Sequence, residues 1–264
     1  MITDRTFLSF LNCRRKAFLQ TAGSPGEKPD IERVQLDIEA LYRRKALEAF
    51  LGACQPSDVV RDPTSWAAVS GAPRVIVNVT VGDCDLRAQL QAAEQIQSQG
   101  GQGALKYAPV FFLSANHLTR SDKLLLAFQA LALASVQGAI PPVAKLVHGD
   151  GKKVLKLKVE PLLGEVRQIV AEILAAQAKL SAPRVTLNGH CSACEFRAPC
   201  RQAAETADDL SLLRGIPAKE VEKHRCRGVT TITLFSHTAL SVKTFEIWAF
   251  GQSGESAELS ALPG

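Results

Sequence analysis

Three cysteines close together near the end of the chain are the residues best suited to do chemistry. Cys191, Cys194 and Cys200 have the spacing C-x2-C-x5-C. This spacing lets one short loop direct three soft sulfur ligands toward a single centre. A tetrahedral metal ion or an iron–sulfur cubane needs a fourth ligand. The pattern therefore predicts a metal centre whose last ligand comes from elsewhere in the chain.

Cys13 is the best candidate for that fourth ligand. It lies in the run Phe-Leu-Asn-Cys-Arg-Arg-Lys, where the basic neighbours favour a thiolate. Its participation would connect the two ends of the chain. Four thiolates suit a [4Fe-4S] cluster and a structural zinc ion equally well. Two alternatives stay open: zinc bound by the three late cysteines with His190, and no metal. The isolated Cys54, Cys84 and Cys226 are expected to pack as small apolar residues.

The composition is that of an ordinary globular protein. A chain of 264 residues is long enough for one large domain or two small ones. Its net charge of +5 is compatible with polyanion binding but decides little. The longest apolar run is shorter than a bilayer, and the N-terminus lacks the regions of a signal peptide. We therefore expect a cytoplasmic protein without a membrane anchor, whose cysteines form no disulfide framework.

Apolar periodicity predicts a mixed order of helices and strands. Helical spacing is found over residues 6–20, 30–53, 124–136 and 162–180. Strand patterns are found over residues 74–80, 84–91, 105–113, 143–148 and 153–159. The first three strands are placed to form a meander, and the fold class is therefore α/β.

The cysteine pattern resembles that of RecB-like nucleases with an iron–sulfur cluster, including the CRISPR-associated ones. Cys13 lies in a Leu-x-Cys-Arg-Arg-Lys-x-x-Leu setting, and the C-x2-C-x5-C follows late. In that family one strand carries Pro-Val-Glu-Tyr-Lys and the next helix carries Gln-Leu-x-x-Gln-Ala-Leu-x-Leu-Glu. Here Pro109 to Leu113 and Leu125 to Ala134 occupy these places. The resemblance covers about residues 5 to 205 and favours a 4Fe-4S cluster over zinc.

The resemblance implies a restriction-endonuclease-like fold, which is a mixed sheet flanked by helices, and DNA cleavage with Mg²⁺ or Mn²⁺. Such chemistry needs an Asp and then a Glu-x-Lys to hold the cation and the attacking water. Phe111 and Leu113 stand at the Glu and Lys positions. Asp85 is the candidate for the preceding acid, and Gln91 competes for the same place. We therefore expect Mg²⁺ or Mn²⁺ only if activity survives, for example through a displaced Glu94 or His117.

The segment from Leu212 to Val221 resembles one helix-hairpin-helix. In such hairpins Gly215 would let backbone N–H groups approach a DNA phosphate. The alternative is a packing hairpin with a solvated basic face. The basic residues expected near the glycine are Lys219, Lys223, Arg225 and Arg227.

These observations predict a nuclease-fold domain over residues 1–205 and a tail over residues 238–264. Between them, residues 206–237 are expected to form a C-terminal helical hairpin, which is the helix-hairpin-helix-like appendix. The favoured hypothesis is a DNA-binding protein, acting on single strands or ends, with impaired or absent nuclease activity and a cluster that serves as a structural clamp. One alternative is an active metal-dependent DNA exonuclease with displaced ligands. Another is an adapter that binds a helicase or a second nuclease and no DNA. Longer relatives continue into further catalytic domains, so the resemblance implies a short or truncated member.

Overall fold

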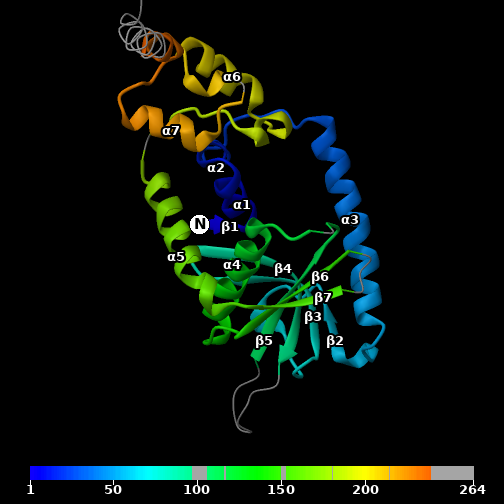
Figure 1. Ribbon diagram of the computed structural model, residues 1–264. Coiled ribbons are helices and arrows are strands. Elements are labelled where there is room, and N and C mark those ends of the chain that lie inside the picture. The colour runs from blue at the N-terminus through cyan, green and yellow to red at the C-terminus, as the bar shows by residue number, and fades with distance from the viewer. Residues whose placement is uncertain (97–105, 116, 150–152, 180, 214, 239–264) are drawn as a thin grey trace, which may run out of the picture. The chain divides into compact units, whose positions relative to one another are not determined.

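The structure is a computed structural model that describes residues 1–96, 106–115, 117–149, 153–179, 181–213 and 215–238 (Figure 1). The chain divides into two compact units. The first comprises Met1–Pro183 together with Ala193–Glu195, and the second comprises Arg184–Ser192 together with Phe196–Gly264. The expected tail lies outside the described residues, except for Thr238.

The first unit contains a mixed, seven-stranded sheet. Its strands are β1 (Ile2–Thr3), β2 (Val59–Arg61), β3 (Val75–Gly82), β4 (Leu86–Ile96), β5 (Lys106–Leu113), β6 (Val143–His148) and β7 (Lys153–Lys158). The order is β2-β3-β4-β5-β6-β7, and β1 pairs with β4. Strands β3, β4 and β5 form the antiparallel meander that the sequence predicts, whereas β6 runs parallel to β5.

Helices cover both faces of this sheet. Those of the first unit are α1 (Asp4–Asn12), α2 (Arg14–Thr21), α3 (Asp30–Leu51), α4 (Arg120–Gln137) and α5 (Glu160–Gln177). Helices α1, α2, α4 and α5 contribute to the larger apolar core, and α3 contributes to a smaller core built on other strand residues. Figure 1 shows α4 and α5 in green and α3 in blue on opposite sides of the strands. The predicted α/β fold with a mixed sheet flanked by helices is confirmed.

Helix α4 is the central support of the sheet, and local sequence sets both of its ends. Thr119 and Asp122 form a reciprocal capping box at its start. Gly138 ends it with a left-handed backbone (φ 76°), which glycine adopts without steric cost. The helix is apolar around most of its circumference because α1, α5 and the sheet all pack against it. Among the described helices, none has the length and apolar character needed to cross a membrane.

The prediction of one continuous helix over residues 6–20 is wrong. Cys13 has an extended backbone (φ −165°, ψ 116°) and separates α1 from α2. Its N–H group donates to the carbonyl of Ser9, and its own carbonyl accepts from the N–H of Ala17. Neither glycine nor proline marks this break, so periodicity alone did not detect it. The break places the Cys13 thiol at a corner between two helices.

The second unit is small and contains α6 (Arg197–Thr206) and α7 (Ala218–Cys226). A 3-10 turn, η4 (Leu210–Leu212), lies between these helices. Helix α6 falls within the range expected for the nuclease-fold domain but belongs to this second unit. Another short 3-10 segment, η3 (Gly189–Ala193), carries the first of the late cysteines.

Candidate functional site

The sheet forks where β4 leaves β5, and this fork lies at the strand that the resemblance marks as catalytic. The pairing of β4 with β5 extends to Ala92 and Val110. The pairing of β4 with β1 involves Leu86 and Arg87. Between these two pairings, residues 88–91 of β4 have no strand partner among the described residues on the edge that faces β1 and β5, although the opposite edge pairs with β3. We call this stretch, with the facing end of β5, the fork.

The side chain of Gln91 fills part of the fork. It is buried, and its Oε1 accepts the backbone N–H of Phe112 at 2.8 Å. The side-chain oxygen of Gln91 thus accepts the N–H group that a backbone carbonyl of β4 would accept if β4 and β5 remained paired here. The alternation of side chains between the two faces of β4 is also interrupted here. Leu90 and Ala92, which would share a face in a regular strand, pack in the larger and the smaller core respectively. Gln91, the alternative to Asp85 for the acidic position, therefore has a structural contact at the fork.

Asp4 and Gln129 form a polar contact beside the fork that sequence reasoning missed. Asp4 Oδ2 accepts the backbone N–H of Gln89 at 2.7 Å, and its Oδ1 accepts from Nε2 of Gln129 at 2.9 Å. Burial raises the pKa of Asp4 above its ordinary value, although these two hydrogen bonds act in the opposite direction. Oε1 of Gln129 is buried without a hydrogen-bond partner in the described structure. The available signal was one glutamine within the apolar run of α4.

The two positions expected to carry Glu and Lys are apolar in their surroundings as well as in type. Phe111 and Leu113 are half-buried and pack against the larger core. The displaced acid considered from sequence, Glu94, instead forms an ion pair with Lys145 of β6, and both side chains are largely buried. His117 is exposed in the segment before α4. Neither of these two residues supplies the carboxylate that Phe111 lacks.

Asp85 lies in an exposed turn at the start of β4. Asp83 Oδ1 accepts the N–H groups of Asp85 and Leu86, which shapes this turn. The carbonyl of Asp85 accepts the N–H of Ile2 at 2.7 Å and so helps to position β1. Along an extended strand, the six residues to Gln91 span about 20 Å. The structure therefore places Asp85 at the β1 end of the fork, away from Gln91 and the facing end of β5.

The turn before Cys191 is organised around Asn188. The Sγ of Cys191 accepts the backbone N–H of Asn188 at 3.3 Å, and the N–H of Cys191 donates to the Asn188 carbonyl. Oδ1 of Asn188 accepts the N–H of His190 at 2.9 Å and lies 3.7 Å from the Cys191 sulfur. The turn therefore fixes the position of the Cys191 sulfur, which accepts one hydrogen bond from Asn188 and donates another to its side-chain oxygen.

The segment that carries Cys194 is attached to the first two helices. Glu195, which follows it, accepts hydrogen bonds from Arg5 of α1 and from Gln20 of α2. The backbone carbonyl of Glu195 also accepts the N–H of Glu27. All of these residues belong to the first unit. A segment about 180 residues later in sequence therefore returns to the helix pair that has Cys13 at its corner.

The pKa of Glu195 lies below its ordinary value. Burial by itself raises the pKa, but the Gln20 hydrogen bond and the positive charges of Arg5, Lys16 and Lys28 together outweigh it. The carboxylate is therefore ionised at neutral pH and attaches this segment to the helices as an anion.

The four candidate ligands are shared between the two units. Cys13 and Cys194 belong to the first unit, and Cys191 and Cys200 to the second. Cys194 is buried, and the other three are half-buried. No group of three or more His, Cys, Asp or Glu side chains that could hold a metal is identified within the described ranges. The four-cysteine centre thus stays a prediction.

The isolated cysteines differ from one another in their burial. Cys54 is half-buried and packs against the smaller core. Cys84 and Cys226 are exposed, so the expectation that both pack inside is wrong. Both lie next to turns, where the side chain faces solvent.

The basic residues of the appendix divide into two groups. Lys219, Lys223 and Arg227 are exposed at intervals of four residues along α7 and its C-terminal end. Gly215, before this helix, has a left-handed backbone (φ 85°), and open space lies where a Cβ would be. The side chain of Arg225 is only 8% exposed, and its charge is paired with Asp209 rather than directed at a DNA-facing surface.

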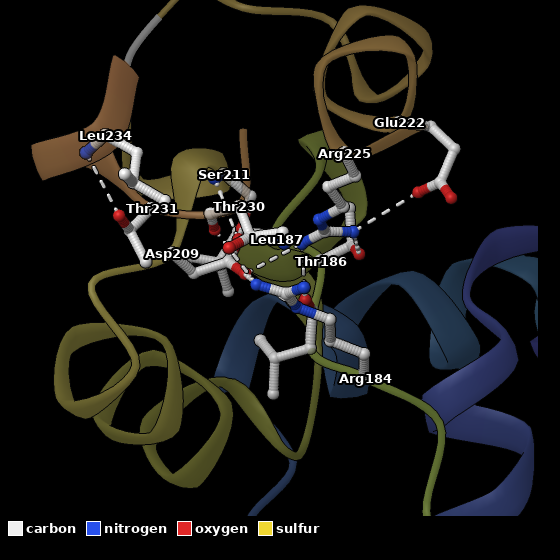
Figure 2. A network of polar contacts seen from close by, with 11 residues as sticks. Arg184, Thr186, Leu187, Asp209, Ser211, Glu222, Arg225, Thr230, Thr231 and Leu234 are labelled. Carbon is white, nitrogen blue, oxygen red and sulfur yellow. Dashed lines mark hydrogen bonds and ion pairs between the residues drawn. The ribbon is translucent and has the colours of Figure 1, made fainter. Parts of the chain in front are cut away.

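Arg225 belongs to an ion-pair network that holds the second unit together (Figure 2). Its Nη2 lies 2.8 Å from both oxygens of Asp209, which also pairs with Arg184. Asp209 further accepts from the N–H and hydroxyl of Ser211, and that hydroxyl accepts the N–H of Leu187. The network thus ties the segment leading to Cys191 to η4 and α7.

Comparison with known proteins adds no relative to this description. No protein-family model and no curated protein matches the chain.

Proposed function

We propose that this chain is a RecB-like protein of restriction-endonuclease-like fold that binds DNA and lacks ordinary nuclease activity. The observation that carries the proposal is the packing of Phe111 and Leu113 against the larger core at the fork. A cation held against a phosphate needs carboxylate ligands. Two half-buried apolar side chains at these positions provide neither a ligand nor a proton donor.

The topology supports the proposed fold. Strands β3, β4 and β5 form an antiparallel meander. Helix α4 then crosses over to β6, which runs parallel to β5. The fork lies at the end of β5, where polar side chains from α1 and α4 approach β4. This arrangement is what an active site built on such a meander would need, and here its acidic set is incomplete.

A four-thiolate centre fits the donor set as a structural clamp. Cys13, Cys191, Cys194 and Cys200 would hold the cluster, and the backbone N–H of Asn188 is directed at the sulfur of Cys191. A bound [4Fe-4S] cluster, or alternatively a zinc ion, would supply bonds between segments that are distant in sequence. The attachment of Glu195 to α1 and α2 supports this role independently of the metal.

DNA contact is proposed for the exposed face of α7. Lys219, Lys223 and Arg227 lie on one side of this helix, and the open space at Gly215 leaves its own backbone accessible to a phosphate. Contacts of this kind carry little sequence information. We therefore propose binding to the phosphate backbone of single strands or DNA ends, with a strong dependence on salt.

Metal analysis and absorbance spectra of protein purified without oxygen test the clamp. We expect about four iron atoms per chain, with their loss in Cys13→Ser and retention in the control Cys84→Ser, since Cys84 is exposed and outside the ligand set. Zinc in place of iron would support the alternative metal. Protein free of both metals, or retention of metal by Cys13→Ser, would contradict the clamp.

A cleavage assay with Mg²⁺ or Mn²⁺ on single-stranded DNA tests the loss of activity. We expect no cleavage by the wild-type protein or by Asp85→Ala. Cleavage that Asp85→Ala abolishes would establish the active exonuclease instead. A gel-shift titration at two salt concentrations tests DNA binding, because the adapter hypothesis requires that no salt-sensitive shift occurs.

A further inference from the structure

Strand β7 is the last strand in the order of the sheet, and one of its two sides is open. Along the other side it is hydrogen-bonded to β6 over its whole length, from Lys153 to Lys158. On the open side, no strand pairs with it in the part of the sheet that the structure describes. All of its side chains are exposed except that of Leu157, which is half-buried. We call the open side of residues 153–158 the β7 edge.

The β7 edge offers backbone hydrogen-bonding groups to a partner. In an antiparallel pair such as β6 and β7, alternate residues direct their N–H and C=O groups away from the neighbouring strand. About half of the residues of β7 therefore present both groups at the open side. The strand has six residues, which is an ordinary strand length. The β7 edge can thus accept one further strand of ordinary length.

Three lysines give the β7 edge its positive charge. Lys153, Lys156 and Lys158 are exposed, and the strand contains no acidic residue. None of the three forms an ion pair with another residue that the structure describes. Lys145 of the neighbouring strand differs from them, because it is paired with Glu94 and largely buried. The three charges of β7 are therefore available to a partner.

Two exposed apolar side chains accompany these lysines. Val154 is 50% exposed and Leu155 is 37% exposed. They lie on opposite faces of the sheet, because Val154 is opposite Val147 of the smaller core and Leu155 is opposite Leu146 of the larger core. A polypeptide strand beside β7 would cover an apolar side chain on each face, which a phosphate backbone would not do. These two residues therefore favour a protein partner over a nucleic acid.

Charge determines which strand fits the β7 edge. A second copy of β7 would bring lysines against lysines, and lysines on an open edge oppose such pairing. A carboxylate opposite each lysine would instead form a cross-strand ion pair. We propose that the β7 edge binds an extended, acidic segment of a partner protein, which adds to the sheet as a further strand. This site lies in the first unit and is separate from the DNA contact proposed for α7 in the second.

Fluorescence anisotropy of a labelled, end-capped peptide with the full chain tests this proposal. The probe is Glu-Val-Glu-Val-Val-Glu, which places an acid opposite each lysine when it lies antiparallel to β7. We expect saturable binding between about 1 µM and about 1 mM. A peptide with lysine in place of glutamate should not bind, and neither should the acidic peptide with methylated backbone nitrogens. The methylated peptide keeps its charges but donates no backbone hydrogen bond, so it separates strand addition from simple charge attraction.

Charge reversal on β7 tests the position of the site. The double variant Lys156→Glu with Lys158→Glu should weaken binding of the acidic peptide at least about tenfold. Arg74→Glu with Arg167→Glu is the matched control, because both arginines are exposed outside β7 and the net charge changes by the same amount. Circular dichroism verifies that both double variants keep their secondary structure.

Four results would overturn the proposal. The first is an acidic peptide that does not bind by about 1 mM. The second is equal binding of the methylated peptide, and the third is an equal effect of the two double variants. The fourth is binding of a single-stranded oligonucleotide that the β7 double variant weakens while peptide binding is unchanged, because the β7 edge would then be a nucleic-acid surface.

Discussion

The ion pair between Asp209 and Arg225 leads to the sharpest prediction for stability. Asp209 is 1% exposed and the Arg225 side chain is 8% exposed, so the pair is shielded from water. Replacing Asp209 by Ala leaves the guanidinium largely buried without its main counter-charge. Breaking a buried pair from one side costs about 3–5 kcal/mol. Because Asp209 also accepts from Ser211, the second unit loses several contacts at once.

Hydrogen exchange measured by mass spectrometry is the appropriate assay, because it reports each segment separately. A cost of about 3 kcal/mol corresponds to exchange faster by roughly 100-fold in segments that open together. We expect this change in α7 and in residues 184–188, while β3 and β4 of the first unit keep their rates. Glu222→Ala is the control, since Glu222 pairs with Arg225 but is 67% exposed. An exposed pair contributes at most about 1 kcal/mol.

The pH dependence provides a second readout of the same pair. Burial by itself raises the pKa of Asp209, but the Ser211 hydrogen bonds and the Arg225 guanidinium outweigh this effect, so the net shift of the pKa is downward. A lowered pKa contributes stability above the unfolded value of about 3.9, and this is lost as pH falls through the folded value. The difference between wild type and Asp209→Ala should therefore be full at pH 7 and shrink below about pH 4. Equal exchange in Asp209→Ala and Glu222→Ala at pH 7 would falsify this account.

Three further predictions concern the fork, the returning segment and α7. Gln91→Leu should lower the free energy of unfolding by about 1–3 kcal/mol in urea titrations, because the N–H of Phe112 loses its acceptor in a buried place; an unchanged midpoint would show that the fork does not need this bond. Glu195→Gln should destabilise the protein at neutral pH by an amount that shrinks as pH falls below about 4, since the lowered pKa of Glu195 stabilises the fold only while the carboxylate is ionised; thermal unfolding of both proteins from neutral to acidic pH checks this. Lys219→Glu with Lys223→Glu should weaken DNA binding and reduce its salt dependence without changing thermal unfolding, and an unchanged gel shift would exclude this face of α7.

The local sequence predicted the longer helices and strands from α3 to α5, apart from the short β2, because each has its own periodicity. The apolar run of α4, its Thr119 cap and its terminal Gly138 are adjacent in sequence, and so are the alternating residues of β3. The apolar character of Phe111 and Leu113, where the resemblance leads us to expect Glu and Lys, is likewise local, because alternate residues on one strand share a face. These features needed no knowledge of distant contacts.

Tertiary structure decided what surrounds those positions. The fork depends on which residues of β4 face β5 and β1, and this register is set by packing across the whole sheet. Asp4 meets Gln129 across 125 positions of sequence. Arg225 has the same residue type as its exposed neighbours on α7, yet the fold buries it against Asp209. Sequence spacing specifies neighbours along one element, whereas burial and ion pairing depend on which elements pack together.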